Sequence, residues 1–155
     1  MKTFSTIVLV VIFILVLIYF IFGNSYSFTA DIDGSAFKAD RGGASYRSGR
    51  LVISVGNAGP DSTQVMLYVN ATKVGTYLFN DDNLQTGNIA LYSIGNGKII
   101  FTSTSSFTGS VTILDLDKKK VSGTFVFRAV QVQPYGSRVV NVTNGAFEDV
   151  PINAH

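Results

Sequence analysis

Apolar and polar residues alternate with a period of two along most of the chain after Gly23. In the stretch YSFTADI, Tyr26, Phe28, Ala30 and Ile32 fall on one face, and the residues between them fall on the other. Alternation over a short run is typical of a half-buried strand, and no segment after Gly23 has the periodicity of an amphipathic helix. We therefore expect an all-β domain. The same pattern recurs in LVISV, QVMLYVN, NIALYSI, KIIFTST, SVTIL, GTFVFRAV and RVVNVT.

Turn signals separate these segments. Asp33-Gly34 and Asn96-Gly97 have the composition of tight hairpin turns, because glycine accepts positive φ. The three lysines of DKKKV predict a solvent-exposed hairpin end, where charge blocks edge-to-edge pairing, and Gly123 just beyond them predicts a bulge. Regularly spaced short strands favour an antiparallel β-sandwich or a flattened barrel of about 8–10 strands. The sequence does not choose between these two closures.

The segment Phe4 to Phe22 contains no charged residue, glycine or proline. As a helix it would be about 28 Å long, close to the thickness of a bilayer, and only a helix satisfies its own backbone groups in lipid. We expect residues 1–23 to be an N-terminal transmembrane anchor. Lys2 would lie in the cytoplasm, which places residues 24–155 in the periplasm and makes the protein a single-pass protein of the inner membrane. If cleavage occurs after the small residues that follow Phe22, the domain is instead secreted or in the outer envelope.

The composition excludes several kinds of site. The chain has no cysteine, so it has no disulfide, no cysteine metal site and no lipobox. Without Lys2 there are eleven basic residues (twelve minus Lys2) and ten acidic ones, a balance that argues against a nucleic-acid surface. The only histidine is His155, at the terminus, so we expect no catalytic histidine, no cofactor and no metal. The domain is therefore expected not to be an enzyme.

Two Asp-x-Asp pairs are the remaining candidates for chemistry. Asp31 and Asp33 flank one turn, and Asp115 and Asp117 flank another. Such a pair could bind Ca²⁺ or act as acid and base. The alternative, which we favour, is that these aspartates bond to the backbone of their own turns.

Two tyrosines are the candidates for a binding surface. Tyr68 and Tyr92 fall on the face opposite the apolar stripe of their segments, so we expect them to form an exposed aromatic patch for a partner or ligand.

Four segments carry a family resemblance: FTADIDGSAFKA, GTYLF, GSVTILDLDKKKVSGTFVFRA and VVNVTNGAFEDV, in this order. Over Ser27 to Val150 the chain resembles a family of small uncharacterised envelope proteins of Bacteroidota, classed as a domain of unknown function, with SGTF and NGAF as the most specific motifs. The resemblance implies an all-β envelope domain that is commonly a lipoprotein, and it implies no catalytic residues. Here a hydrophobic segment replaces the lipid-carrying cysteine, which favours the inner membrane. Asp61-Ser62-Thr63 also resembles the short O-glycosylation motif of such proteins.

Three functions are compatible with these features. The first is a non-enzymatic, membrane-anchored interaction module that serves as an accessory subunit of an envelope protein assembly, with a protein partner there. The second is a small lipid- or glycan-binding β domain, with its ligand in the mouth of a barrel or on the tyrosine patch. The third is a hydrolase, which would require aspartates converging in one cleft.

Overall fold

The computed structural model describes residues 26–83, 85–134 and 136–153, and these residues form eleven β-strands. The predicted helix over residues 4–22 lies outside them, and within the described part of the chain no helix has the length and hydropathy needed to cross a bilayer. The strands are β1 (Ser27–Ile32), β2 (Ser35–Lys38), β3 (Arg41–Arg47), β4 (Arg50–Gly56), β5 (Thr63–Val69), β6 (Gly75–Phe79), β7 (Ile89–Ile94), β8 (Ile99–Thr102), β9 (Gly109–Leu116), β10 (Lys120–Gln133) and β11 (Val139–Pro151).

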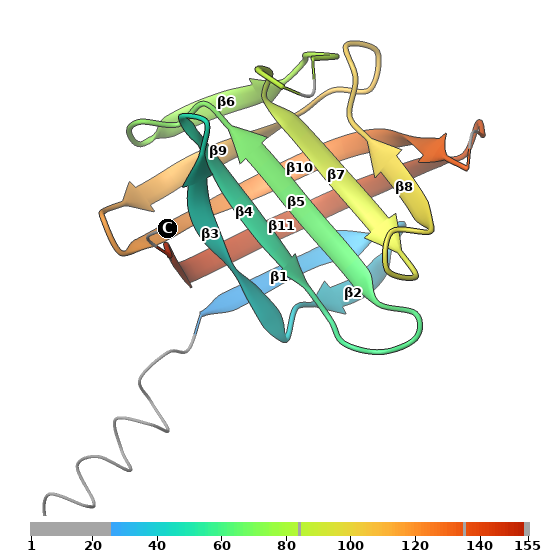
Figure 1. The fold of residues 1–155 in the computed structure, drawn as a ribbon, viewed down its shortest axis with the longest axis horizontal. Coiled ribbons are helices and arrows are strands. Elements are labelled where there is room, and N and C mark those ends of the chain that lie inside the picture. Colours follow the sequence, from blue (N-terminus) through green and yellow to red (C-terminus); the bar gives the residue numbers. More distant parts are fainter. Residues whose placement is uncertain (1–25, 84, 135, 154–155) are drawn as a thin grey trace, which may run out of the picture.

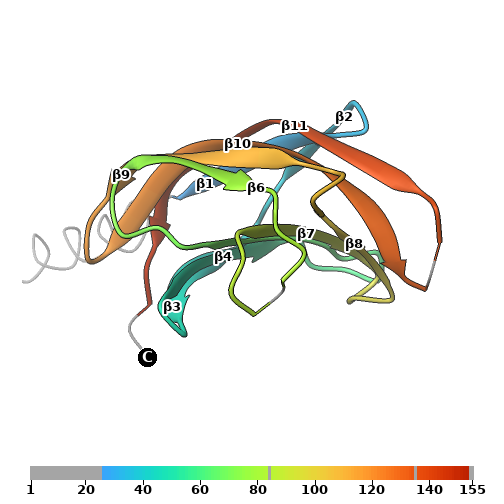
Figure 2. The same ribbon diagram turned by 90° about the horizontal axis from the view of Figure 1, so that it is seen from above.

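All the named strands pair in one antiparallel sheet, in the order β2-β1-β11-β10-β8-β7-β5-β4-β3. The long strand β10 also pairs with β9 through its first half, and β9 pairs with β6. The sheet curls, so that β6, β9, β10, β11, β1 and β2 form an upper layer over a lower layer of β8, β7, β5, β4 and β3 (Figures 1 and 2). The expected antiparallel all-β fold is confirmed. The strands number eleven rather than about 8–10, and they belong to a single curled sheet.

The chain after β11 connects the two layers on one side. Ile152 forms a parallel bridge with Ala44 of β3, and the backbone N–H of Asn153 donates a hydrogen bond of 2.8 Å to the carbonyl of Ala44. This contact pairs part of the outer edge of β3, which would otherwise be free to pair with another chain.

The inward-facing side chains of the strands form the core between the layers. Phe28, Phe125, Phe127 and Phe147 are almost completely buried, and their rings lie within 5.0–6.2 Å of one another in consecutive contacts. Burying each such side chain contributes about 1.5–3 kcal/mol. The strands in which alternation is cleanest therefore have the faces that the sequence predicts.

The predicted turns are also confirmed. Asp33 and Gly34 have φ values of 48° and 82° and join β1 to β2, as a hairpin turn with two left-handed residues requires. Gly95, Asn96 and Gly97 likewise have positive φ between β7 and β8. The three lysines lie at the β9–β10 hairpin end, and the pairing of both β9 and β11 with β10 shifts register beside Gly123, which is the predicted bulge.

Two similar segments, GTYLF in β6 and GTFVF in β10, lie on either side of β9 in the same register. Ile113 pairs with both Gly75 and Gly123, and Thr112 pairs with both Thr76 and Thr124. The repetition therefore has a structural meaning: both segments turn their aromatic residues inward and their threonines outward against one central strand.

Candidate functional site

Aspartates of both pairs accept hydrogen bonds from other residues of the fold. Asp33 Oδ1 accepts a 2.8 Å hydrogen bond from the N–H of Asn141, and Asp31 Oδ2 accepts one of 2.7 Å from the side chain of Asn144. Asp117 Oδ1 accepts the N–H groups of Lys119 and Lys120, and these bonds hold the pKa of Asp117 below its ordinary value.

The two aspartate pairs belong to different hairpins, and among the described residues no three His, Cys, Asp or Glu side chains gather to hold a metal. The favoured interpretation, that these aspartates bond to the backbone of their own turns, is confirmed for Asp117, whereas Asp31 and Asp33 bond to residues of the distant strand β11.

The two tyrosines lie on opposite faces of the sheet. Tyr68 projects outward from β5 and is half-buried, with the guanidinium carbon of Arg50 at 5.1 Å from its ring centroid. Tyr92 is only 8% exposed and packs against Phe101 in the core, with ring centroids 5.6 Å apart. The expectation that Tyr92 is exposed is wrong. Its neighbour across the ladder is the buried Val65, so pairing with β5 places Tyr92 on the inner face.

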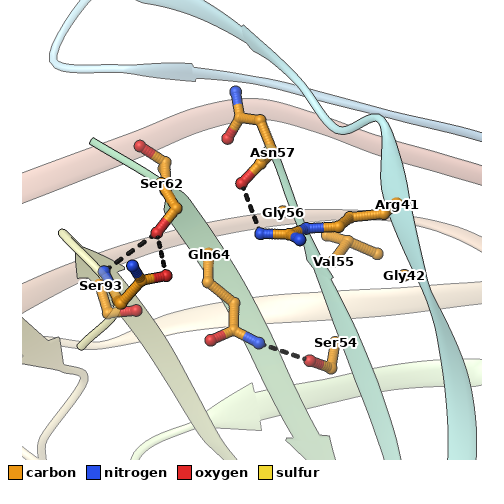
Figure 3. A pocket seen from close by; sticks show the side chains of 11 residues that line it. Arg41, Gly42, Ser54, Val55, Gly56, Asn57, Ser62, Gln64 and Ser93 are labelled. Atoms are coloured by element: carbon orange, nitrogen blue, oxygen red, sulfur yellow. Dashed lines mark hydrogen bonds between the residues drawn. The ribbon is translucent and has the colours of Figure 1, made fainter. Parts of the chain in front are cut away.

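The outer face of the lower layer contains a polar hollow of about 360 Å³ (Figure 3). Strands β3, β4, β5 and β7 and the loops that follow them supply its lining. Gln64 Nε2 donates a 2.9 Å hydrogen bond to Ser54 Oγ across its floor. Arg41 Nη2 donates one of 3.0 Å to the carbonyl of Asn57, which holds the guanidinium over the hollow. The lining consists of Arg41, Gly42, Ser54, Val55, Gly56, Asn57, Ser62, Thr63, Gln64, Ser93 and Asn96.

A second hollow, of about 280 Å³, adjoins the first at Ser54, and we call the two hollows together the groove. Its apolar part is made by Val52, Met66 and Tyr68, and the Tyr68 hydroxyl lies 3.8 Å from the sulfur of Met66. Arg47 also lines this hollow.

The groove lining carries positive charge and one unpaired acceptor. It contains two arginines, Arg41 and Arg47, and neither hollow is lined by an aspartate or glutamate. Asn57 Oδ1 is shielded from solvent and has no hydrogen-bond partner within the described part of the chain. An unpaired buried acceptor is unfavourable by about 1–3 kcal/mol.

The Asp61-Ser62-Thr63 motif lies in the loop between β4 and β5, but its serine is held within the fold. Ser62 is 8% exposed, donates to Asn96 Oδ1 at 2.7 Å and accepts from the N–H of Asn96 at 3.0 Å. Its hydroxyl therefore joins this loop to the β7–β8 turn.

A different surface occupies the outer face of the upper layer. A row of small residues crosses five strands, from Thr76 on β6 through Thr112, Thr124 and Ala146 to Thr29 on β1, and all of them except the half-buried Thr112 are exposed. The Thr76 and Thr112 hydroxyls lie 2.9 Å apart, within hydrogen-bonding distance. We call this surface the threonine face, and define it as Thr29, Thr76, Leu78, Ser110, Thr112, Leu114, Thr124, Val126 and Ala146.

The apolar residues of the threonine face are unusually exposed. Leu78, Leu114 and Val126 are 56%, 63% and 45% exposed, and no residue of the face is charged. Charged residues lie at its border, since Arg128 follows Val126 outward along β10 and Glu148 follows Ala146 along β11. An uncharged centre with a charged rim is typical of a protein–protein interface.

Sequence reasoning missed both surfaces, although each has a signal. Ser54 and Ser93 interrupt otherwise apolar strands, and their outward polarity marks the groove. The outward threonines of GTYLF, SVTIL and GTFVF mark the other face. In each case the missing information was the pairing of strands, because only pairing brings these positions into one row.

A comparison with curated proteins found no match, and a comparison with solved structures found none either. One family model does match, over residues 24–151, which include all eleven strands. The expectation of an uncharacterised family is therefore confirmed. The chain belongs to the family described as a domain of unknown function, DUF6252.

Proposed function

We propose that this protein is a non-enzymatic interaction module that docks a protein partner on the threonine face. The observation that carries this proposal is the exposure of Leu78, Leu114 and Val126, all about half exposed or more, on one uncharged face of three adjacent strands. Leu78 and Val126 flank Ser110 in one row, and Leu114 lies further along β9, beyond the threonine row. A monomeric soluble domain gains nothing by exposing such a patch, whereas covering it with a partner buries the three side chains at about 25 cal/mol per Å².

The geometry of the patch suits a protein surface as the partner. The threonine hydroxyls alternate with the aliphatic side chains, so a partner can form hydrogen bonds between its apolar contacts. Strand β6, which borders the patch, pairs only with β9 among the named strands, and its other edge provides further backbone donors and acceptors.

Membrane attachment is the second part of the proposal. The apolar segment of residues 4–22 would anchor the domain in the inner membrane and expose it to the periplasm, where the partner belongs to an envelope assembly. Fractionation tests this part. The protein should remain in the membrane pellet after an alkaline carbonate wash and be released when residues 1–23 are deleted. Recovery of the undeleted protein in the soluble periplasmic fraction would show that the segment is not an anchor.

The alternative function is a small lipid- or glycan-binding domain. A ligand in the mouth of a barrel is disfavoured, because the space between the layers is filled by buried side chains such as Phe28, Phe79 and Phe127. A ligand on the outer face is favoured by the groove beside Tyr68.

Site-specific photo-crosslinking in the native host tests the docking proposal. A photoreactive phenylalanine derivative is placed at Val126 or Leu78 in the full-length protein, and at Val132 as the matched control. Val132 lies on the same strand, points outward and is 42% exposed, against 45% for Val126, but it is not part of the threonine face. We expect one discrete adduct from positions 78 and 126 and none from position 132.

A charge substitution gives the matching loss of function. Val126→Asp should reduce co-purification of the crosslinked protein by tenfold or more, because it desolvates a carboxylate at the centre of the contact. Val132→Asp should leave co-purification unchanged. Equal crosslinking from all three positions, or no effect of Val126→Asp, would exclude the threonine face as the docking surface.

A further inference from the structure

The groove on the lower layer, made by the two hollows that share Ser54, combines cationic, amide, hydroxyl and aromatic groups. We propose that it binds a short saccharide that carries a carboxylate. The strands that line the groove and the strands that carry the threonine face belong to different layers of the curled sheet (Figure 2). Binding in the groove would therefore be independent of the docking of a protein partner.

The acidic group is recognised by the two arginines. One Nη of Arg41 is engaged by the Asn57 carbonyl, which orients the guanidinium over the polar hollow and leaves its other N–H donors for a ligand. Arg47 lies in the neighbouring hollow. Neither arginine forms an ion pair with a residue that the structure describes, and no carboxylate lines the groove. Paired N–H donors of arginine match the two oxygens of a carboxylate.

The hydroxyl groups of a sugar match the floor of the polar hollow. Gln64 uses one N–H to bond Ser54, so its carbonyl oxygen and second N–H are left for other partners. Gln64 on β5 lies directly opposite Ser93 on β7, and it reaches Ser54 on β4, which itself lies opposite Met66, through its side chain. Amide and hydroxyl groups can both donate and accept hydrogen bonds. They are therefore suited to bind neighbouring sugar hydroxyls, which also donate and accept hydrogen bonds.

The apolar face of a sugar ring matches the second hollow. Tyr68, Met66 and Val52 form a patch whose polar atoms lie at its margin, since the Tyr68 hydroxyl contacts the Met66 sulfur. Arg50 packs over the Tyr68 ring and donates to the Gly87 carbonyl at 3.0 Å, which holds the aromatic group in place. An aromatic residue beside polar groups can pack against the apolar face of a sugar ring while the polar groups form hydrogen bonds with the sugar hydroxyls. The two hollows, about 360 and 280 Å³, have the size of small-ligand sites.

Titration of the full-length protein with three probes separates the parts of this proposal. The protein is held in a detergent without sugar head groups. Trigalacturonate carries both carboxylates and sugar hydroxyls, its trimethyl ester keeps the sugar without the charge, and triglutamate keeps the charge without the sugar. Calorimetry measures affinity, and backbone amide chemical shifts locate the site.

We expect trigalacturonate to bind with a dissociation constant below about 1 mM and to shift the amides of Gly42, Ser54 and Gly56. The ester and triglutamate should each bind at least tenfold more weakly. Lack of saturable shifts with trigalacturonate, or shifts outside the groove, would overturn the proposal. If the ester binds as tightly as trigalacturonate, the site does not recognise the carboxylate. If triglutamate binds as tightly as trigalacturonate, the groove is a site for acidic peptides instead.

Variants complete the test. Arg41→Ala and Gln64→Ala should each weaken trigalacturonate about tenfold, the first through lost charge and the second through lost hydrogen bonds. Arg128→Ala is the matched control, because it removes the same charge from the upper layer. Two folded variants, Arg41→Ala and Gln64→Ala, that bind as tightly as the parent protein would contradict the assignment of the groove. Photo-crosslinking at Val126 is unaffected by any of these results, so failure of one proposal is distinguishable from failure of the other.

Discussion

Gly123 and Phe147 lie opposite each other on β10 and β11, and the Phe147 ring occupies the space that a side chain on Gly123 would need. A Cβ at Gly123 would lie 2.7 Å from Phe147 Cζ and would collide with the Thr112 carbonyl. The relationship is reciprocal. Two residues along, Gly145 faces Phe125, and a Cβ there would lie 2.6 Å from that ring. The SGTF and NGAF motifs are therefore two halves of one packing device, in which each phenylalanine covers the glycine of the other strand.

Replacing Gly123 with alanine tests this device. We expect Gly123→Ala to lower the free energy of unfolding by about 1–3 kcal/mol, the usual result of overpacking a close-packed core. Urea unfolding of residues 24–155 measures the change. Gly136→Ala is the control, because a Cβ there meets only the end of the flexible Gln131 side chain. Equal losses in the two variants would show that contact with Phe147 is not the cause.

Asp33 links the first hairpin to β11 by a side-chain hydrogen bond and also has a left-handed backbone conformation. Asp33→Ala removes the acceptor for the Asn141 N–H and places alanine at φ 48°, so we expect a loss of about 1–2 kcal/mol in the free energy of unfolding. Asp33→Asn keeps a side-chain oxygen and tolerates the left-handed conformation, so it should retain most of the stability. If both variants unfold at the same urea concentration as the parent protein, neither the hydrogen bond nor the backbone conformation of Asp33 contributes to stability.

The contact between Asp82 and Ser105 should make stability depend on pH. The Ser105 N–H and hydroxyl each donate to Asp82 at 2.7 Å, and these bonds lower the pKa of Asp82. As the pH falls, Asp82 is protonated at a higher pH in the unfolded chain than in the folded protein. The stabilisation is therefore fully present above the pKa of the unfolded state and is lost as the pH falls through the pKa of the folded state. Asp82→Asn should therefore destabilise the protein at about pH 6 and have less effect at about pH 3.

A double-mutant cycle checks the assignment to this pair. Ser105→Ala should remove the same pH-dependent part of the stability, and the double variant should add little to either single variant. Additive effects at about pH 6 would show that the two residues act separately.

Ser62 should matter for stability through its two hydrogen bonds to Asn96. We expect Ser62→Ala to lower the free energy of unfolding by about 1–2 kcal/mol, because it leaves partly buried groups of the β7–β8 turn without partners. Ser106→Ala, in an exposed loop, is the control and should change little. A neutral Ser62→Ala would mean that the loop and the turn are held together by other contacts.

Local alternation predicted most strand faces correctly, and NIALYSI shows where it fails. In YSFTADI the apolar residues occupy a single parity, so the buried face follows from the sequence. In NIALYSI, Ile89 and Leu91 occupy one parity while Ala90, Tyr92 and Ile94 occupy the other. The hydrophobic pattern therefore does not indicate which face of the strand is buried. The register with β5 decides that Tyr92 is buried and that Leu91 faces outward.

The sequence by itself determined the antiparallel all-β class, the turns at Asp33-Gly34 and Asn96-Gly97, the bulge at Gly123 and the inward phenylalanines. Each depends on interactions within one strand or turn, where φ preference and period-two burial act locally. Only the tertiary structure decided the order of the strands, the curl that makes two layers of one sheet, and the two outer surfaces. The groove joins residues of β3, β4, β5 and β7, and the threonine face joins β6, β9, β10, β11 and β1. Such surfaces depend on pairing between distant segments, which the burial of the whole core selects.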